Sequence, residues 1–304
     1  MLNCLLTSLE EIKGSLNMRK LLRITFTRVV IRRAISSLFL LLIMSYCQLL
    51  AANFPRWQGS FEQGGLVLGK VPSQYSVIYQ GKVLKLSSHG YFLLGFGRDA
   101  PKTVELTVVD NNAQKHRQTL SLDQRVYNTQ RIEGVPQETV TPSEKDLKRI
   151  RNDARMVASA RGQVTDDIYF LDGFMPPLSG PITGVYGSQR IYNGIPKRPH
   201  YGIDYAAPTG TLVRAPAGGV VIFAHRDLFY SGGTLIIDHG HGLSSTFLHL
   251  SDIYLELGQS VERGEPIAEV GASGRATGPH LDWRMNWQKE RIDPQLVLKA
   301  LPAK

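Results

Sequence analysis

Two short segments of this sequence carry histidine and aspartate at spacings that allow them to share one metal ion. The segment PHYGID contains His200 and Asp204, and the segment GPHLD contains His280 and Asp282. Imidazole nitrogen and carboxylate oxygen are common zinc ligands, and three such ligands with one open position are typical of zinc hydrolases. The two segments together therefore predict zinc-dependent hydrolysis.

The spacing within each segment limits the local structure. In a strand, His280 and Asp282 point to the same face with Cα atoms about 6.6 Å apart, so both can face one pocket. His200 and Asp204 would be about 13 Å apart in an extended chain, which is too far for shared ligation. The chain must therefore curl between them, and we expect Gly202 to permit a tight loop there.

A further histidine, His249, lies in the apolar run FLHL at residues 247–250. Such a run is typical of a buried strand. An imidazole buried there would be costly without a partner or a chemical role. His249 is therefore a candidate for the same site.

Composition argues against nucleic-acid binding. The chain has 304 residues, 42% hydrophobic and 20% charged, with a formal charge of +9. Residues 1–33 hold seven Lys and Arg against two Glu, so about half of the excess is confined to this end. The remainder contains no basic block, and the electrostatic footprint of a DNA or RNA binder is missing.

The N-terminal charge has another explanation. Three arginines at 28, 32 and 33 precede an uncharged, apolar run at residues 34–52. This is the pattern of a secretory signal, and residues 1–52 are predicted to be a cleaved signal peptide or a retained signal anchor in the inner membrane. Both cysteines, Cys4 and Cys47, lie in this part, so the exported portion is free of disulfides. Export without disulfides fits a bacterial periplasm or cell envelope.

The rest of the chain is predicted to be mainly β. Short alternating runs over residues 53–125 predict a small β-sandwich-like accessory domain. Residues 126–174 form a linker with an amphipathic helix near 142–160. Short strands separated by glycine turns predict an antiparallel β domain over residues 175–300, which holds every candidate ligand.

Four motifs in this last domain resemble one family. They are RPHYGID at 198–204, IDHG at 237–240, FLHL at 247–250 and GRATGPH at 274–280. In this order they resemble the lysostaphin-type (LytM, M23) zinc metallopeptidases, in the form found in exported proteobacterial proteins. The resemblance covers about residues 175–298.

The resemblance implies roles for individual residues. His200 and Asp204 would bind one Zn²⁺ ion, and His249 and His280 would flank the attacking water and the oxyanion. The third ligand would be residue 282, which is histidine in most of the family and Asp282 here. Asp282 either completes a His-Asp-Asp site or is an outer acceptor that orients His280, with the third ligand missing. With Asp282 as a second carboxylate ligand, the zinc ion would be formally neutralised. Its bound water would then be less acidic than in a site with one carboxylate.

The resemblance also implies a function. Export and family together predict a zinc metalloendopeptidase that cleaves peptide bonds of peptidoglycan, in cross-links or stem peptides. The alternative is a catalytically inactive LytM module that activates a cell-wall amidase.

The remaining histidines of this domain, His225, His239 and His241, are expected at turns or on the surface, outside the metal site.

Overall fold

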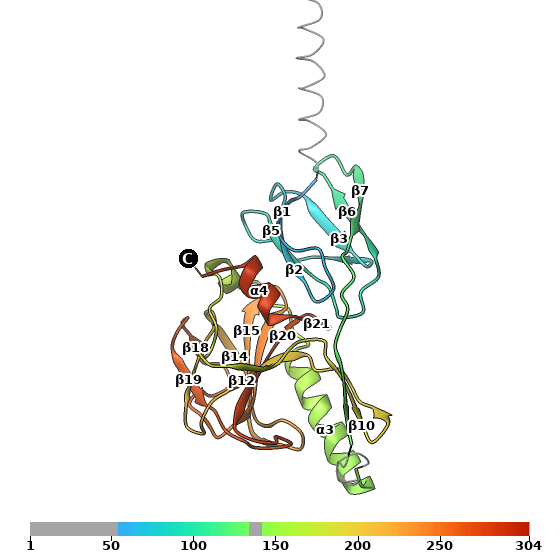
Figure 1. The fold of residues 1–304 in the computed structure, drawn as a ribbon. Helices are drawn as coiled ribbons and strands as arrows, with labels where there is room; N and C mark the ends of the chain where they lie inside the picture. The colour runs from blue at the N-terminus through green and yellow to red at the C-terminus, as the bar shows by residue number, and fades with distance from the viewer. Residues whose placement is uncertain (1–53, 134–141, 304) are drawn as a thin grey trace, which may run out of the picture. The chain divides into compact units, whose positions relative to one another are not determined.

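The computed structural model describes residues 54–133 and 142–303 (Figure 1). The predicted signal peptide or anchor at residues 1–52, with its apolar run at 34–52, lies outside them. Among the described residues, no helix has the length and apolar character needed to cross a membrane.

The N-terminal β region, residues 55–125, consists of two small antiparallel sheets, one of three strands and one of four. Alternating side chains such as Leu66, Phe92 and Leu106 are fully buried and form its core. The first sheet has the order β1-β2-β5 and the second β4-β3-β6-β7. Their bounds are β1 (Arg56–Gly59), β2 (Leu66–Lys70), β3 (Ser76–Tyr79), β4 (Lys82–Val83), β5 (Tyr91–Gly95), β6 (Thr103–Val109) and β7 (Lys115–Ser121).

The connecting segment contributes a strand and a helix. Strand β8 (Thr129–Ile132) pairs in parallel with β10 (Gln189–Tyr192). Helix α3 (Glu144–Ala160) begins after Ser143, whose hydroxyl accepts a hydrogen bond from the main-chain N–H of Asp146, as an N-cap does. The amphipathic helix expected near 142–160 is therefore present.

The C-terminal region is built on an eight-stranded antiparallel sheet of order β18-β14-β15-β16-β20-β12-β9, with β21 paired to β20. Its central strands β15 and β16 are buried throughout, although each carries polar as well as apolar residues. The strands of this sheet are β9 (Ile182–Gly184), β12 (Gly202–Ala206), β14 (Gly219–Leu228), β15 (Gly232–Gly240), β16 (Leu243–Leu250), β18 (Ser260–Val261), β20 (His280–Trp287) and β21 (Glu290–Ile292). Around it lie η1 (Tyr169–Asp172), β11 (Ile195–Pro196), β13 (Leu212–Arg214), β17 (Asp252–Ile253), β19 (Pro266–Glu269) and α4 (Pro294–Ala300). The predicted mainly β fold, with a small sandwich, a linking helix and an antiparallel C-terminal region, is confirmed.

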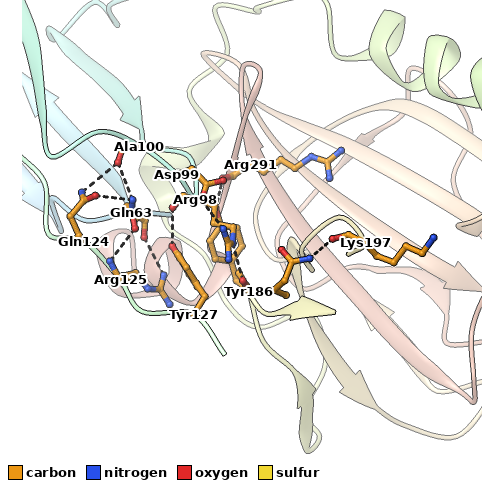
Figure 2. A network of polar contacts seen from close by, with 12 residues as sticks. Gln63, Arg98, Asp99, Ala100, Gln124, Arg125, Tyr127, Tyr186, Lys197 and Arg291 are labelled. Atoms are coloured by element: carbon orange, nitrogen blue, oxygen red, sulfur yellow. Dashed lines mark hydrogen bonds and ion pairs between the residues drawn. The ribbon is translucent and has the colours of Figure 1, made fainter. Parts of the chain in front are cut away.

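A polar and aromatic network joins the N-terminal β region to the C-terminal sheet (Figure 2). Arg125 donates to the buried carboxylate of Asp293 at 2.8 Å. The guanidinium of Arg98 lies 4.3 Å from the centre of the Tyr127 ring and donates through Nε to the Gly187 carbonyl oxygen. These contacts hold residues 125–127 against the C-terminal region, directly before the strand that pairs with β10.

Of the three histidines expected at turns or on the surface, His241 lies in a turn, whereas His225 and His239 lie in strands β14 and β15. His239 lies in β15 and is fully buried, with Nδ1 at 2.7 Å from the Gly218 carbonyl oxygen and Nε2 at 2.9 Å from the Ser245 hydroxyl. His241 does follow the strand in a turn, but it is buried too. The expectation was wrong for His239, and for His241 it was correct about the turn. Neither ring is at the surface, because each packs edge-on or tilted against a phenylalanine of the preceding segment, Phe174 and Phe170 respectively.

Burial of His239 predicts a loss of stability in acid. Burial lowers its pKa from 6.5 to about 4, against the opposing hydrogen bond to Gly218. The unfolded state then takes up a proton first as the pH falls, so the free energy of unfolding is at its full value above pH 6.5 and drops by about 3 kcal/mol between pH 6.5 and 4. Urea unfolding at pH 7.5, 5.5 and 4.5 measures this drop. It should be smaller in His239→Gln, and an equal drop in both proteins would contradict the assignment.

Candidate metal centre

Two buried carboxylates face each other across neighbouring strands. Asp204 on β12 pairs directly with Asp282 on β20, and their exposed fractions are only 7% and 2%. Like charges at directly opposite positions destabilise a sheet, and burial increases the cost. This arrangement calls for positive charge between or beside the two side chains.

His200 completes a cluster with these carboxylates. It lies just before β12, where its main-chain N–H donates to the Ser188 carbonyl oxygen, and its side chain is buried. Its Nε2 lies 3.1 Å from Asp204 Oδ1, yet neither atom has a hydrogen-bond partner. Ligand atoms of His200, Asp204 and Asp282 all lie within 4.8 Å of one another. Two ligands of a tetrahedral zinc ion are roughly 3.4 Å apart, so the three residues fit such an ion.

Two glycines leave room for the carboxylates. A Cβ added to Gly184 would lie 2.1 Å from Asp204 Oδ2, and one added to Gly202 would lie 2.4 Å from Asp282 Oδ1. The expected role of Gly202 in a tight loop was wrong, because it is the first residue of β12. Its lack of a side chain serves close packing against Asp282 instead.

Asp282 has a cationic partner, Arg284, that was not among the residues predicted for the site. Nε of Arg284 donates to both carboxylate oxygens at 2.9 and 3.0 Å, and Nη2 donates to Oδ2 at 2.5 Å. Burial alone would raise the pKa of Asp282, but the Arg284 guanidinium and then His200 outweigh it and hold that pKa well below its usual range. The carboxylate is therefore ionised. The signal was present in the sequence, since residues 280, 282 and 284 of one strand share a face.

A β-bulge turns His249 toward the same site. Strand β16 has two residues, Leu248 and His249, opposite the single residue Thr234 of β15, because the register shifts between Gly233 and Leu235. His249 has a φ of 64°, a left-handed conformation that is uncommon outside glycine. Both Leu248 and His249 consequently line one groove, which strict alternation would not allow.

His249 and His280 form a second pair at this site. Their ring centres are 4.8 Å apart. Nδ1 of His249 lies 2.8 Å from the Ser273 carbonyl oxygen, and Nδ1 of His280 lies 2.8 Å from that of Gly278. Because a carbonyl oxygen only accepts, each Nδ1 carries a proton, and Nε2 is the ring nitrogen left to exchange a proton with a substrate. Burial lowers the pKa of His249, although the Ser273 contact opposes it, so its neutral basic form is favoured.

All five residues predicted for the site line one groove of about 1050 Å³. The other lining residues include members of β10, β16, β20, β21 and the loops before β12 and β20, together with residues of α3 and Arg161 at its C-terminal end. A groove of this kind, with a buried three-ligand cluster and two neighbouring imidazole bases, can hold a metal ion and an extended peptide next to proton acceptors.

Comparison with known proteins gives the class. Residues 198–294 match the model of peptidase family M23, so the chain carries an M23 peptidase domain, as the motifs predicted. A peptidoglycan DD-endopeptidase of Vibrio cholerae, ShyB, is 36% identical over 121 residues, which cover 40% of this chain and 26% of ShyB. The DD-carboxypeptidase/endopeptidase Mpg of Neisseria meningitidis is 44% identical over 105 residues, covering 34% of this chain and 24% of Mpg. The chain thus spans about a quarter of the length of these curated relatives.

A solved structure extends the likeness beyond this domain. The crystal structure of an M23 peptidase-family protein from Pseudomonas aeruginosa superposes with a TM-score of 0.64 at 28% identity. The match covers 80% of this chain and 97% of that one. The fold likeness therefore includes residues outside the 198–294 match.

Proposed function

We propose that this chain is an exported zinc metalloendopeptidase that hydrolyses peptide bonds in peptidoglycan cross-links or stem peptides. One observation carries the proposal: buried atoms of His200 and Asp204 face each other at 3.1 Å without hydrogen-bond partners, beside the ionised Asp282. The names of relatives such as ShyB and Mpg support peptidoglycan as the substrate. The basic and then apolar sequence before residue 53 supports export.

In this proposal His200, Asp204 and Asp282 hold one zinc ion. When bound, zinc supplies a Lewis acid for the scissile carbonyl and acidifies a water molecule. His249 takes a proton at Nε2, since its Nδ1 is committed to the Ser273 carbonyl oxygen. His280 has its Nδ1 committed in the same way, so it can stabilise the developing oxyanion or give a proton to the leaving amine only after its Nε2 has taken up a proton.

Arg284 bears on the replacement of the usual histidine by Asp282, because it alters the net charge of the proposed site. A zinc ion with one carboxylate and two imidazoles has a net charge of +1. Two carboxylates reduce this to zero, but the Arg284 guanidinium adds a positive charge beside Asp282, and Arg190 lies 3.8 Å from Asp204. The sequence predicted a less acidic site, and the ion pair offsets that effect. Asp282 is thus proposed as the third ligand.

The proposal assigns a role to each part of the chain. Residues 175–300 form the peptidase domain and 53–125 an accessory domain. Residues 126–174 are a linker that also contributes to the groove. Residues 1–52 are the signal peptide or anchor, which places the enzyme in the periplasm or cell envelope.

The alternative of an inactive module that activates an amidase receives less support. Such a module has no need to keep the catalytic set, whereas four of the five residues usual in the family are present here, the fifth is the possible ligand Asp282, and all five positions line one groove. Amidase stimulation without peptide-bond cleavage would nevertheless establish that alternative.

Removal of the metal tests the proposed function. The full-length protein, purified in detergent, should contain about one zinc per chain by mass spectrometry of the metal and should release new amino termini from purified peptidoglycan. Prolonged chelation should remove the metal and abolish release, and added zinc should restore both. Wild-type protein that holds no metal and releases no peptide ends would overturn the proposal.

A further inference from the structure

The groove around the metal centre is strongly cationic. Its lining includes eight lysines and arginines but only three acidic residues among those that the structure describes. Two of the acids, Asp204 and Asp282, are the proposed ligands, and the third, Asp153, accepts a hydrogen bond from the main-chain N–H of Phe229 at 2.8 Å. Positive charge in excess of what these carboxylates neutralise points to an anionic ligand.

Arg161 is one of five arginines in the groove that make no described ion pair, the others being Arg151, Arg198, Arg275 and Arg291. It follows α3, and its Nη2 donates to the Thr246 hydroxyl at 2.5 Å. Its Nε is inaccessible to solvent and has no partner. Burial lowers the pKa of Arg161 to about 10, and the nearby guanidinium groups of Arg291 and Arg284 add to the effect. The surroundings of this cation are thus short of negative charge.

Arg291 on β21 is another of these arginines, and its guanidinium is near those of Arg161 and Arg284. Its main-chain oxygen accepts from the Tyr186 hydroxyl at 2.7 Å, which holds the backbone in place while the side chain extends away from the network (Figure 2). Its guanidinium lies 4.4 Å from the centre of the Tyr201 ring. Burial lowers its pKa too, and Arg284 adds to this. The Tyr201 ring covers the face of the Arg291 guanidinium, and among the described residues no carboxylate pairs with its N–H groups.

The strand register places these two arginines next to the metal centre. Thr246, the partner of Arg161, pairs with Arg284 on β20, one same-face step beyond Asp282. Arg291 pairs with Asn286, one step further. Each step is about 7 Å, so the two arginines lie roughly 7–14 Å along β20 from the proposed ligand, which an extended peptide spans in two to four residues.

We propose that Arg161 and Arg291 bind a free carboxylate of the peptide substrate, at a subsite two to four residues from the scissile bond or at the end of a side branch. This inference rests on the proposed function. Two guanidinium forks can take both oxygens of one carboxylate, and an anion there removes the repulsion among Arg161, Arg284 and Arg291. Arg284 remains committed to Asp282. The linker that carries Arg161 thus contributes directly to substrate choice.

Chemical amidation of the substrate tests the subsite. Cross-linked muropeptides are used in native form and after carbodiimide coupling of their carboxylates to ammonia. Full-length wild-type protein should cleave the native form about 10- to 100-fold more efficiently in kcat/KM. In Arg161→Gln and Arg291→Gln, kcat/KM for the native form should fall by a similar factor, mainly through KM, while the amidated form is cleaved as by wild type.

Matched controls separate this inference from its premise. Arg155→Gln removes an exposed charge from α3 outside the groove and should retain wild-type selectivity. Zinc content and thermal unfolding of every variant exclude loss of the fold as the cause. Equal cleavage of native and amidated muropeptides by wild type would overturn the subsite and leave the peptidase intact. If wild type cleaves neither form, the proposed function itself fails.

Discussion

Replacing His200 or Asp204 by alanine is expected to reduce bound zinc from about one ion per chain to nearly none, and peptide-bond hydrolysis by on the order of a thousandfold or more. Both side chains are buried, and their facing atoms have no other partner. Removal of either leaves two ligands, which is too few for a stable protein zinc site. Metal analysis and release of amino termini from peptidoglycan measure the two effects.

The control for these variants is His89→Ala, which removes an exposed histidine of the N-terminal β region. Its zinc content and activity should equal those of the wild type. Asp204→Ala also relieves the repulsion between Asp204 and Asp282, so the metal-free variant should unfold at a temperature no lower than chelated wild type. Full zinc content in both alanine variants would show that the ion, if present, lies elsewhere.

Much of this site could be predicted from the sequence, because several of its residues are neighbours within one strand. The two-residue period of a strand places His280 and Asp282 on one face, and the structure has both on β20. The same rule extends to residue 284, so the cation beside Asp282 could have been predicted as well. The short strands and glycine turns likewise gave the antiparallel class correctly.

The remaining features depend on partners distant in sequence. The bulge at His249 exists because β15 offers one residue opposite two, a register that the FLHL motif does not contain. Gly202 looks like a turn residue in isolation, and only its pairing with Arg284 explains why a side chain cannot be accommodated. The location of Arg161 requires knowing that α3 ends beside Thr246, 85 residues further along the chain.

The second large effect that we expect is a loss of zinc affinity when the pair formed by Asp282 and Arg284 is broken. Asp282→His supplies the imidazole usual in the family, yet we expect it to lower zinc affinity about 10- to 100-fold, because it leaves the Arg284 cation beside the metal without its counter-ion. Arg284→Gln should retain zinc, since all three ligands remain. Loss of the cation raises the pKa of every acid in the site, so its pH–rate profile should move to higher pH.

The double variant decides whether the two residues act as a unit. Asp282→His with Arg284→Gln has a neutral third ligand and no extra cation, so its net charge with zinc is again +1. We expect its zinc affinity to return to within about tenfold of wild type, and the double-mutant cycle to give a coupling of about 1–3 kcal/mol. Isothermal titration calorimetry of zinc into the metal-free proteins measures the zinc affinity of wild type, both single variants and the double variant. Additive losses would mean that Arg284 does not compensate for the aspartate. We therefore expect the histidine common in the family to replace Asp282 with little loss of zinc affinity only together with a change at residue 284.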